Sequence, residues 1–525
     1  MADVARETAF RIGLDPAERV FLMENHDQAY YTWREAGVKQ RILIHIDAHH
    51  DMWWVKDKAP ITIADFICPA LREDIVGEVF WVVPDATWGT ASGRGAILRH
   101  LKKITGKYPA ASGAPKVGQD EISVIVLGKK VSVCSLRSLP RIDESALLDI
   151  DVDFLVIPRV TYGEIDQHGA LPWCWPEELL ARLTACQIRA DLVTIVYSVE
   201  GGYTPLKWKY LGDELALRLG QPSALGQGLE GFGLMRAAST AGEKGDTATA
   251  EEKYQQAASL LPGSGACPWH LAHLYAKLGR IEEGRRAYQR ALELDPCYRT
   301  AYNSAGFRYY WDRRFPEAEK EHLRTLALDP DDAYAHLGLG QLAVHKKHWK
   351  EAETLLRRSL ALNKELIDSY RELGNILARQ RRYDEAIRAY ERSLKLALTG
   401  HKPMTGPLLT QPAQPRLLDP DHSLIHARLA HLYLKKGAIA PAISAYRLSA
   451  GGGNDGVGLR VHLASLYLKQ GQKKKAATEA WRAVKLIPTD LKRMSRTLRK
   501  RLRKRMRRFV LERGRTLLSL GSAPG

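Results

Sequence analysis

The first half of the chain alternates short apolar segments with longer segments of mixed character. The apolar segments are four to six residues long, the length of a buried strand, and the segments between them are long enough to form helices. This alternation predicts an α/β domain built on a parallel sheet, in which binding sites collect where the strands end. The expected strands are residues 20–23, 41–46, 79–83, 123–127, 147–150 and 193–197.

The second half repeats a pattern every 34 residues. Pro262, Pro296 and Pro330 stand 34 residues apart, and Gly437 and Gly471 show the same interval. Small and aromatic residues recur at fixed places between them, as expected where neighbouring helices approach closely. This period resembles that of tetratricopeptide repeats, in which helix pairs stack into an all-α solenoid with a concave groove suited to extended peptides. About seven such units are expected.

Two segments depart from this repeat. Residues 399–420 contain five prolines and cannot be helical, so they are expected to form an insertion or hinge. After Thr489, apolar residues recur at intervals of three and four, which predicts an amphipathic basic helix. This helix either caps the solenoid or binds a polyanion.

The sequence therefore predicts five parts, with the first boundary at a segment rich in Gly and Ser near residues 220–228. They are a metallohydrolase-like α/β domain (1–225), tetratricopeptide repeats (226–398), a Pro-rich insertion (399–420), further repeats (421–490) and a basic helix and tail (491–525).

The composition is that of a chain that can bury a core, with 45% hydrophobic and 26% charged residues. No apolar run is long enough to span a membrane, and the first residues lack the apolar core of a signal peptide. We therefore expect a cytoplasmic protein that does not enter a membrane.

The net charge of +18 is concentrated near the end of the sequence. Between Lys492 and Arg515 there are thirteen Lys and Arg residues against one acid, Glu512, so this segment carries +12 and the rest of the chain +6. An acidic partner, such as an acidic stretch of a peptide or RNA, is therefore expected for the tail alone.

Two of the expected strands end in groups of metal-binding residues. The first group follows the strand 41–46, and the second ends the strand 147–150. They consist of Asp47, His49 and Asp51, and of Asp149, Asp151 and Asp153, respectively. Alternate residues of an extended segment point the same way, and three carboxylates on one side repel unless a cation neutralises them. Carboxylates mixed with imidazoles suit Mn²⁺, Fe²⁺ or Zn²⁺ better than Ca²⁺, and a carboxylate-rich site favours Mn²⁺.

The residues around both groups resemble motifs of a known superfamily. The run Asp-Ala-His-His-Asp at 47–51 resembles the Asp-Ala-His-x-Asp motif of the arginase and agmatinase superfamily, and Asp-Val-Asp-Phe-Leu at 151–155 resembles its Asp-x-Asp-x-Leu strand end. The resemblance covers about residues 15–215. It implies a three-layer α/β fold of the arginase and deacetylase type and two Mn²⁺ ions held by two histidines and four aspartates.

Transferred by motif, this resemblance implies the ligands His26, Asp47, His49, Asp51, Asp151 and Asp153. His26 is the only placement for the remaining histidine, although the glycines that flank it in the superfamily are missing. Asp47 and Asp151 are each expected to bridge the two ions. A second register, with Asp149 and Asp151 as the ligands, stays open. The register with Asp151 and Asp153 is preferred because Phe-Leu then follows in its usual place. Asp149 is then expected to hydrogen-bond to a ligand and not to bind the metal itself.

The resemblance also implies a reaction. The domain is shorter than arginases proper and looks most like a divergent arginase-like family, some members of which convert arginine to ornithine within ribosomally made peptides. It implies a hydrolase acting on C–N bonds of linear amidines, here the guanidinium of an arginine residue in a peptide or protein that the repeats hold. The products are ornithine and urea.

Other residues are candidates for binding substrate and moving protons. Glu200 ends an expected strand just before a Gly-Gly pair, and its carboxylate is a candidate for binding the guanidinium, although it is equally consistent with a surface acid. His50 and His168 are both candidates for the proton-transferring histidine of the superfamily.

Three alternative functions remain open from the sequence. A deacetylase of the same superfamily would typically use a single Zn²⁺ and fewer carboxylates, which the set of six expected ligands, four of them aspartates, disfavours. A non-catalytic peptide-binding scaffold would have lost its metal ligands, whereas the motif residues are intact. A nucleic-acid-binding protein is supported by the basic tail alone.

Overall fold

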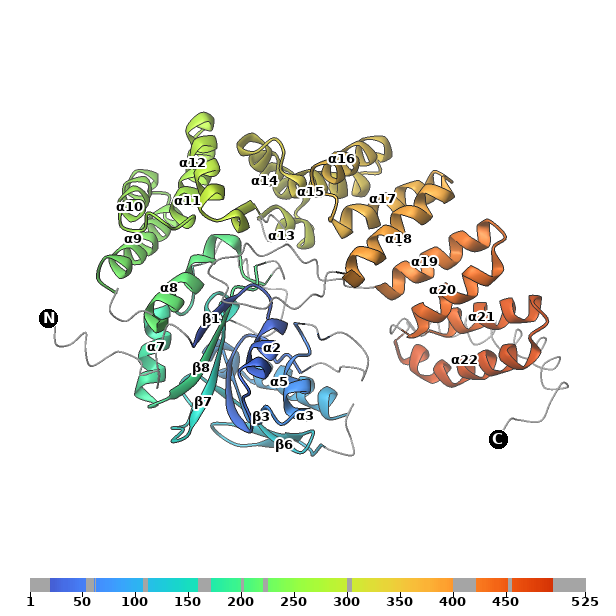
Figure 1. The fold of residues 1–525 in the computed structure, drawn as a ribbon, viewed down its shortest axis with the longest axis horizontal. Helices are drawn as coiled ribbons and strands as arrows, with labels where there is room; N and C mark the ends of the chain where they lie inside the picture. The colour runs from blue at the N-terminus through green and yellow to red at the C-terminus, as the bar shows by residue number, and fades with distance from the viewer. Residues whose placement is uncertain are drawn as a thin grey trace. The chain divides into compact units, whose positions relative to one another are not determined.

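The structure is a computed structural model that describes residues 19–52, 61, 63–106, 112–158, 171–199, 203–220, 225–299, 305–399, 422–451 and 456–493. Among these residues, those up to Lys346 form one compact unit and those from Lys347 onward form a second. The first unit contains a sheet domain and the first helical repeats, and the second contains further repeats (Figure 1). None of the described helices is long and apolar enough to cross a membrane.

The sheet domain is built on one eight-stranded sheet, in the order β1-β8-β7-β2-β3-β6-β5-β4 (Figure 1). Its strands are β1 (Val20–Met23), β2 (Arg41–Ile46), β3 (Val76–Val83), β4 (Lys116–Val117), β5 (Ile122–Val126), β6 (Lys129–Ser135), β7 (Ser145–Asp151) and β8 (Arg189–Val196). Each of the six apolar segments falls on one of these strands, and the apolar pattern misses β4 and β6.

The sheet is mixed, so the expectation of a parallel sheet was wrong at one edge. In the order of the sheet, each pair of neighbouring strands from β1 through β8, β7, β2 and β3 to β6 is parallel. β5, in contrast, runs antiparallel to both β6 and β4. Leu127 and Gly128, which join β5 to β6, have φ angles of 52° and 80°. Positive φ at both positions is the backbone of a type I′ hairpin turn, and a turn this short permits antiparallel pairing only.

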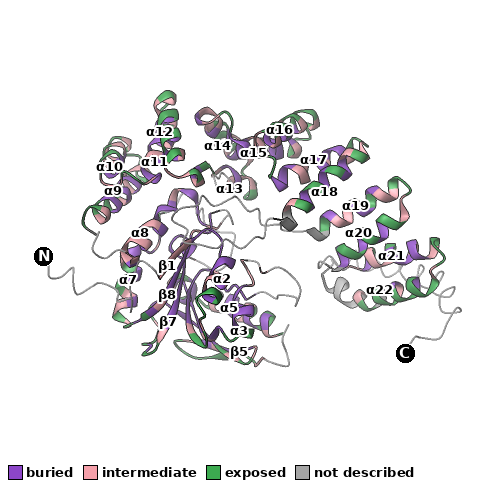
Figure 2. Ribbon diagram, in the orientation of Figure 1, coloured by how far each residue is buried: buried purple, intermediate pink, exposed green. Residues whose placement is uncertain are grey.

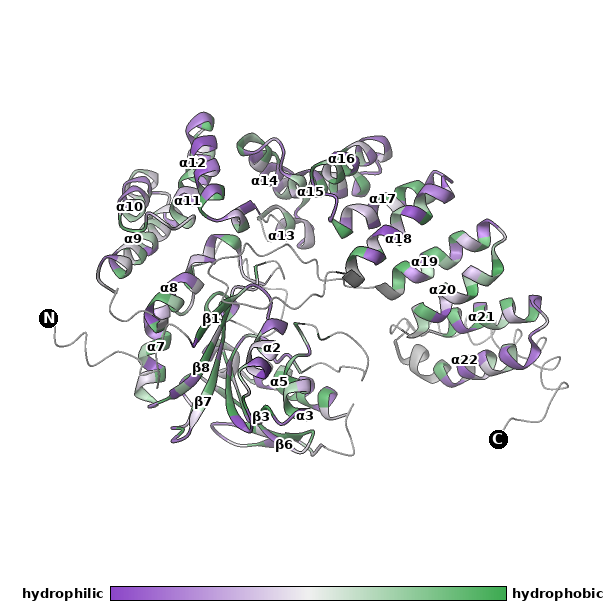
Figure 3. Cartoon of the chain, in the orientation of Figure 1, coloured by the Kyte–Doolittle hydropathy of each residue, from purple (hydrophilic) through white to green (hydrophobic). Residues whose placement is uncertain are grey.

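Helices cover both faces of the sheet, because alternate residues of the central strands enter different hydrophobic clusters. In β2, Ile44 joins a cluster that includes residues of α7 and α8, and Leu43 joins one that includes residues of α2, α3 and α5. These strands are largely buried in Figure 2 and hydrophobic in Figure 3. The helices of the domain are α2 (Asp27–Glu35), α3 (Ile67–Arg72), α4 (Asp85–Trp88), α5 (Ala91–Thr105), α6 (Asp153–Val156), α7 (Pro176–Ala185), η3 (Leu206–Trp208) and α8 (Tyr210–Gly220).

Helical hairpins make up the rest of the described chain. In the first unit they are α9 (Leu225–Glu243), α10 (Thr247–Leu260), α11 (Ala266–Lys277), α12 (Ile281–Leu294), η5 (Pro296–Arg299), α13 (Ala305–Trp311), α14 (Phe315–Leu328) and α15 (Ala333–His345). In the second they are α16 (Trp349–Leu362), α17 (Ile367–Arg379), α18 (Tyr383–Thr399), α19 (His422–Lys435), α20 (Ile439–Gly451), α21 (Val457–Lys469) and α22 (Lys473–Arg493).

A left-handed turn residue sets the repeat. Positive φ recurs every 34 residues, first at glycines and then at positively charged residues, and again at the same interval near the end. The positions are Gly245, Gly279, Arg313, Lys347 and Arg381, and then Gly437 and Gly471. Arg381 and Gly437 are 56 residues apart, 22 more than one repeat, so the repeat pattern is interrupted once, by 22 residues. Of the Pro-rich insertion expected at 399–420, only Thr399 is described, as the last residue of α18; the rest of it and the tail beyond Arg493 lie outside the described residues.

The first repeats share a core with the sheet domain. One hydrophobic cluster runs from Ile44 in β2 through α7 and α8 to Tyr254 in α10, Tyr288 in α12 and Leu328 in α14. Apolar side chains of α8 therefore pack in one core with those of the sheet and of the first repeats, as Tyr210 does against Phe232 of α9.

A buried carboxylate caps one helix of the repeats. Asp332 precedes α15 and accepts a hydrogen bond of 2.7 Å from the backbone N–H of Ala335. Its other oxygen is buried without a hydrogen-bond partner among the described residues. Burial raises the pKa of Asp332 to about 7. Since the carboxyl of an unfolded chain ionises near pH 4, the folded state binds the extra proton between about pH 4 and 7, and this group lowers stability as the pH rises through that range.

We expect Asp332→Asn to raise the free energy of unfolding at pH 8 by about 1–3 kcal/mol, because Asn keeps the capping oxygen and removes the buried charge. At pH 5 the gain should nearly vanish, since the wild-type carboxyl is already protonated. Denaturant unfolding at both pH values measures the difference. Asp246→Asn is the control, because the hydrogen bond from Thr249 lowers the pKa of that exposed capping carboxylate. Equal effects of Asp332→Asn at both pH values would contradict the prediction.

Candidate metal centre

The predicted metal-binding residues lie at the carboxyl ends of neighbouring strands. His26 follows β1 at the start of α2, Asp47 follows β2, Asp151 ends β7 and Ser198 follows β8. Because β1, β8, β7 and β2 are adjacent and parallel, their ends meet at one edge of the sheet. Residues from the beginning and the end of the sheet domain are thereby brought together.

His26 lies at the centre of one half of this site. Its Nδ1 is 3.3 Å from Oδ2 of Asp47, 3.1 Å from Oδ2 of Asp51 and 3.1 Å from Oδ2 of Asp151. One imidazole nitrogen and three carboxylate oxygens therefore converge, which is a donor set suited to a divalent metal ion.

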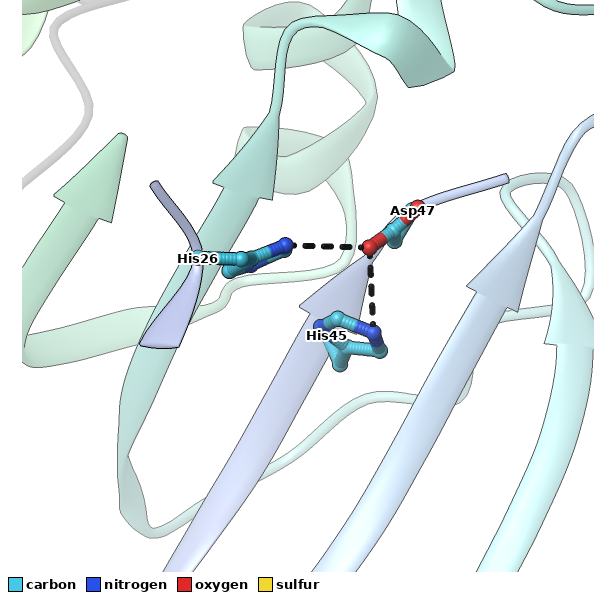
Figure 4. A group of neighbouring side chains, drawn as sticks. All are labelled: His26, His45 and Asp47. Carbon is cyan, nitrogen blue, oxygen red and sulfur yellow. Dashed lines mark ion pairs between the residues drawn. The ribbon is translucent and has the colours of Figure 1, made fainter. Parts of the chain in front are cut away.

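His49 lies at the centre of the other half. Its Nδ1 is 2.8 Å from Oδ2 of Asp153 and 3.3 Å from Oδ1 of Asp47. Asp47 thus turns one oxygen to His26 and the other to His49. Two groups of donor atoms, each close enough together to hold an ion, share this residue: His26, His45 and Asp47, and Asp47, His49 and Asp153 (Figure 4 shows the first). All six residues expected as ligands lie in this one cluster.

Asp149 lies beneath the cluster and holds two imidazoles. Its Oδ2 accepts hydrogen bonds of 2.8 Å from Nε2 of His26 and of 2.8 Å from Nδ1 of His45. Its Oδ1 accepts a hydrogen bond of 2.5 Å from the hydroxyl of Thr194 in β8. The structure therefore places Asp149 behind His26, where the preferred register puts it.

Short local hydrogen bonds fix the carboxylates themselves. Oδ1 of Asp47 accepts the backbone N–H of His49 at 2.6 Å, and Oδ1 of Asp151 accepts that of Asp153 at 2.9 Å, where α6 begins. The hydroxyl of Ser198 donates to Oδ2 of Asp151 at 2.6 Å. Asp51 and Ser198 have positive φ angles, 43° and 52°. Such backbone strain is commonly found at functional sites.

Two carboxylates of the cluster have lowered pKa values. Burial alone would raise the pKa of Asp47, but its contacts with His26 and His49 hold that pKa well below the usual range. In the same way, His26 and His45 outweigh burial and lower the pKa of Asp149 to about 2. The carboxylates that the imidazoles surround are therefore ionised.

The other three carboxylates have raised pKa values. Burial and the charge of Asp47 raise the pKa of Asp51 to about 6, and the same causes raise the pKa of Asp151. Burial and the charges of Asp151 and Asp47 raise the pKa of Asp153 well above the usual value. The imidazoles supply too little positive charge for five buried carboxylates, and a divalent cation would remove the remaining repulsion.

Buried atoms without hydrogen bonds support this interpretation. Oδ2 of Asp47 and Nε2 of His45 are buried and have no hydrogen-bond partner within the described part of the chain. Buried polar atoms are normally satisfied, so two such atoms 3.3 Å apart suit a shared cation. The donors fit one or two divalent metal ions.

A cavity opens beside the cluster. It is lined by the four ligand candidates His26, His49, Asp51 and Asp151 and by Ala48, His50, Ile63, Ala64, His100, Ser198 and Tyr203. The ring centroid of Tyr203 lies 4.7 Å from that of His49, and the rings of His50 and His100 are 5.2 Å apart. The cavity therefore borders the cluster on a side that carries several aromatic rings.

Two predicted site residues lie outside the part of the chain that the structure describes, and the sequence analysis did not identify some residues that the structure places in the site. Glu200 and His168 fall outside the described residues, whereas His50 lines the cavity. Sequence reasoning missed His45, Thr194 and several cavity residues. His45 carried one available signal, its position two residues before Asp47 in the same strand, where side chains face the same way.

Comparisons with known proteins identify the repeats. Models of the tetratricopeptide repeat match residues 243–304, 305–365 and 367–399. The expectation of a tetratricopeptide solenoid is confirmed. No curated protein sequence matches the chain.

Solved structures resemble parts of the chain only distantly. MamA is 17% identical, with 36% of this chain and 98% of that chain covered at a TM-score of 0.29. Pseudomonas aeruginosa pilF is 16% identical, with 46% and 99% covered at a TM-score of 0.27. YrrB, described as "a TPR protein with an unusual peptide-binding site", is 20% identical, with 39% and 94% covered at a TM-score of 0.25. These scores are too low to support an argument about function.

We expect Asp149→Asn to weaken Mn²⁺ binding about 10- to 100-fold, because a neutral amide orients the two imidazoles less firmly and makes them poorer donors. Calorimetric titration of the purified full chain with Mn²⁺ measures this. Asp191→Asn is the matched control. Asp191 lies near the amino end of β8, whereas the metal-binding residues lie at the carboxyl ends of the strands, and it pairs with Arg41 at 2.9 Å. Equal Mn²⁺ affinity of Asp149→Asn and Asp191→Asn would show that Asp149 does not support the centre.

Proposed function

We propose that the sheet domain is a binuclear Mn²⁺-dependent hydrolase that cleaves the guanidinium of arginine residues in a peptide or protein, giving ornithine and urea. The observation that carries the proposal is the position of Asp47, whose two oxygens face two separate groups of donors. Oδ2 lies 3.3 Å from His26, and Oδ1 lies 3.3 Å from His49. A carboxylate placed in this way suits a pair of neighbouring ions.

The motifs support the choice of reaction. The runs at residues 47–51 and 151–155 resemble those of the arginase and agmatinase superfamily, and the resemblance implies six ligands from three separate parts of the chain. These six side chains lie together at one sheet edge. His26 is among them even though the glycines that flank the corresponding histidine of the superfamily are missing here. Agreement of motif and position in space supports an arginase-like centre.

The residues present fit the ions. His26, Asp47, Asp51 and Asp151 would hold one ion, and Asp47, His49, Asp151 and Asp153 the other. Carboxylate oxygens outnumber imidazole nitrogens in this set, which favours Mn²⁺. When bound, two neighbouring ions lower the pKa of a water molecule and so supply a nucleophile at neutral pH.

The protein's own groups prepare the site for this chemistry. Asp149 accepts a hydrogen bond from Nε2–H of His26. In neutral His26 the lone pair of Nδ1 is then the one that can bind a metal ion. Ser198 holds Asp151 in place. Nδ1 of His50 accepts a hydrogen bond of 3.1 Å from the backbone N–H of Met52, so Nε2 is the nitrogen that carries the proton in neutral His50.

The cavity and the repeats would select the substrate. The ring of Tyr203 and the imidazoles of His50 and His100 form a wall against which a planar guanidinium can lie. Glu200 is proposed to bind its charge, as the sequence suggests. Tetratricopeptide repeats form grooves that hold extended chains, so the array is proposed to bind the peptide around the arginine.

The first test of this function is urea release. The full chain loaded with Mn²⁺ should release urea from arginine-containing peptides, and Asp47→Ala should lose metal and activity together, by at least about 100-fold, because both positions lose a ligand. Elemental analysis and a urea assay provide the two measurements, and Asp191→Asn serves as control. Full activity of Asp47→Ala with undiminished metal content would exclude the proposed centre. Release of acetate from acetylated substrates without urea would favour the deacetylase alternative, and metal-free wild-type protein that still binds peptide would favour a scaffold.

A second test concerns substrate size. If the repeats hold the peptide, contacts remote from the guanidinium position it, and kcat/KM for a peptide of ten or more residues should exceed that for free arginine by about 100-fold or more. Steady-state kinetics of the full chain on both substrates decide this. Similar values of kcat/KM for free arginine and peptide would contradict a role of the repeats in catalysis.

A further inference from the structure

A buried imidazole of the centre is absent from the ligand set that the sequence predicts. His45 lies in β2, two residues before Asp47, and its side chain is fully buried. Its Nδ1 lies 2.8 Å from Oδ2 of Asp149, and its Nε2 lies 3.3 Å from Oδ2 of Asp47. Figure 4 shows His26 and His45 approaching the same oxygen of Asp47 from two directions.

Asp149 determines which nitrogen of each imidazole carries the proton. An ionised carboxylate only accepts hydrogen bonds, so the nitrogens that face Asp149, Nε2 of His26 and Nδ1 of His45, are the donors. The opposite nitrogens, Nδ1 of His26 and Nε2 of His45, each lie 3.3 Å from Oδ2 of Asp47. Metal-binding histidines commonly donate their second nitrogen to a carboxylate in this way, and here one carboxylate orients two of them.

The environment of Nε2 of His45 suits a cation. In neutral His45 with this tautomer, Nε2 carries a lone pair and faces a carboxylate oxygen 3.3 Å away, and either a proton on Nε2 or a metal ion relieves the repulsion. Neither Nε2 of His45 nor Oδ2 of Asp47 has a hydrogen-bond partner in the described part of the chain, and both are buried. An ion between them would bind both lone pairs, as it would bind Nδ1 of His26.

We propose that His45 is a seventh metal ligand, so that the position beside His26 is held by two imidazoles and by Asp47. The inference rests on the proposed metal centre and is independent of the reaction. It implies that the two positions differ: the one beside His26 has two nitrogens and favours Co²⁺, Fe²⁺ or Zn²⁺ more strongly, and the one beside His49 has one nitrogen and favours Mn²⁺.

The test separates the two nitrogens of His45. In His45→Asn the amide nitrogen takes the place of Nδ1 and can still donate to Asp149, but nothing replaces Nε2. Calorimetric titrations of the full chain with Co²⁺ and with Mn²⁺ measure affinity, and pulsed EPR of the Mn²⁺-loaded protein counts directly bound nitrogens. We expect Co²⁺ affinity at one position to fall at least about 10-fold, more than Mn²⁺ affinity, and one bound nitrogen to be lost.

His322→Asn is the matched control. His322 in α14 is also fully buried, with no hydrogen-bond partner among the described residues for either ring nitrogen, but it packs against Phe307 in the repeats. Its substitution removes a buried imidazole without touching the centre, so metal affinity and nitrogen count should remain those of the wild type.

The outcomes distinguish the proposals. An unchanged number of bound nitrogens in His45→Asn overturns the assignment. This holds even if the affinities for Co²⁺ and Mn²⁺ fall by the same factor, because His45 would then act only by positioning Asp47. If His45→Asn does not fold, the wild type decides: three bound nitrogens per pair of ions support the assignment, and two overturn it. Wild-type protein that binds two ions without releasing urea would defeat the proposed reaction alone, whereas wild-type protein that binds no ion would defeat both.

Discussion

Burial of five carboxylates at one edge of the sheet is the constraint on which the rest of the sheet domain depends. Asp47, Asp149 and Asp153 are fully buried, and Asp51 and Asp151 nearly so. Removing such charges from water costs several kcal/mol each unless hydrogen bonds and opposite charges compensate. The protein supplies imidazoles, backbone amides and two hydroxyls, yet these lower the pKa of Asp47 and Asp149 only. The raised pKa values of the remaining three show the deficit that a metal ion would fill.

This constraint explains the central part of the sheet. In the parallel register of β2 with β7, His45 stands opposite Asp149, and in that of β7 with β8, Asp149 stands opposite Thr194. Two of the groups that satisfy Asp149, His45 and Thr194, therefore come from the strands on either side of it, and the third, His26, follows β1. A shift of one residue would turn the polar side chains of β2 or β7 toward the wrong face, so the site and the strand register support each other.

The sequence predicts the parts of this site that depend on local order, and it fails where a contact depends on register or on an unusual turn. Strand ends followed by alternating Asp and His residues identify the ligands that lie at positions 47–51 and 151–153. His45 gives only the weak signal of its spacing from Asp47, because an imidazole within an apolar strand acquires its role when β7 aligns beside it. The hairpin of β5 and β6 was missed because Leu127 adopts positive φ, which Leu rarely does. In the repeats, likewise, Arg313, Lys347 and Arg381 occupy turn positions that Gly fills in other repeats. The spacing of glycines alone therefore does not show the 34-residue period in this part of the chain, whereas the spacing of prolines does.

The first repeats belong to the sheet domain physically, because a buried cation joins them beside the metal centre. Nζ of Lys209, before α8, lies 2.8 Å from Oδ2 of Asp295 at the end of α12 and 3.9 Å from the ring of Tyr197. Burial alone would lower the pKa of Lys209, but Asp213 and Asp295 outweigh it and raise that pKa, so the amine stays charged.

Tyr197 directly precedes Ser198, whose hydroxyl holds Asp151. Without α12, Lys209 would lose Asp295. The segment that positions a carboxylate of the centre is thus supported by a residue of the repeats. The repeats from α9 to α15 and the cluster around Asp47 are therefore parts of one folded unit and not two modules joined by a linker.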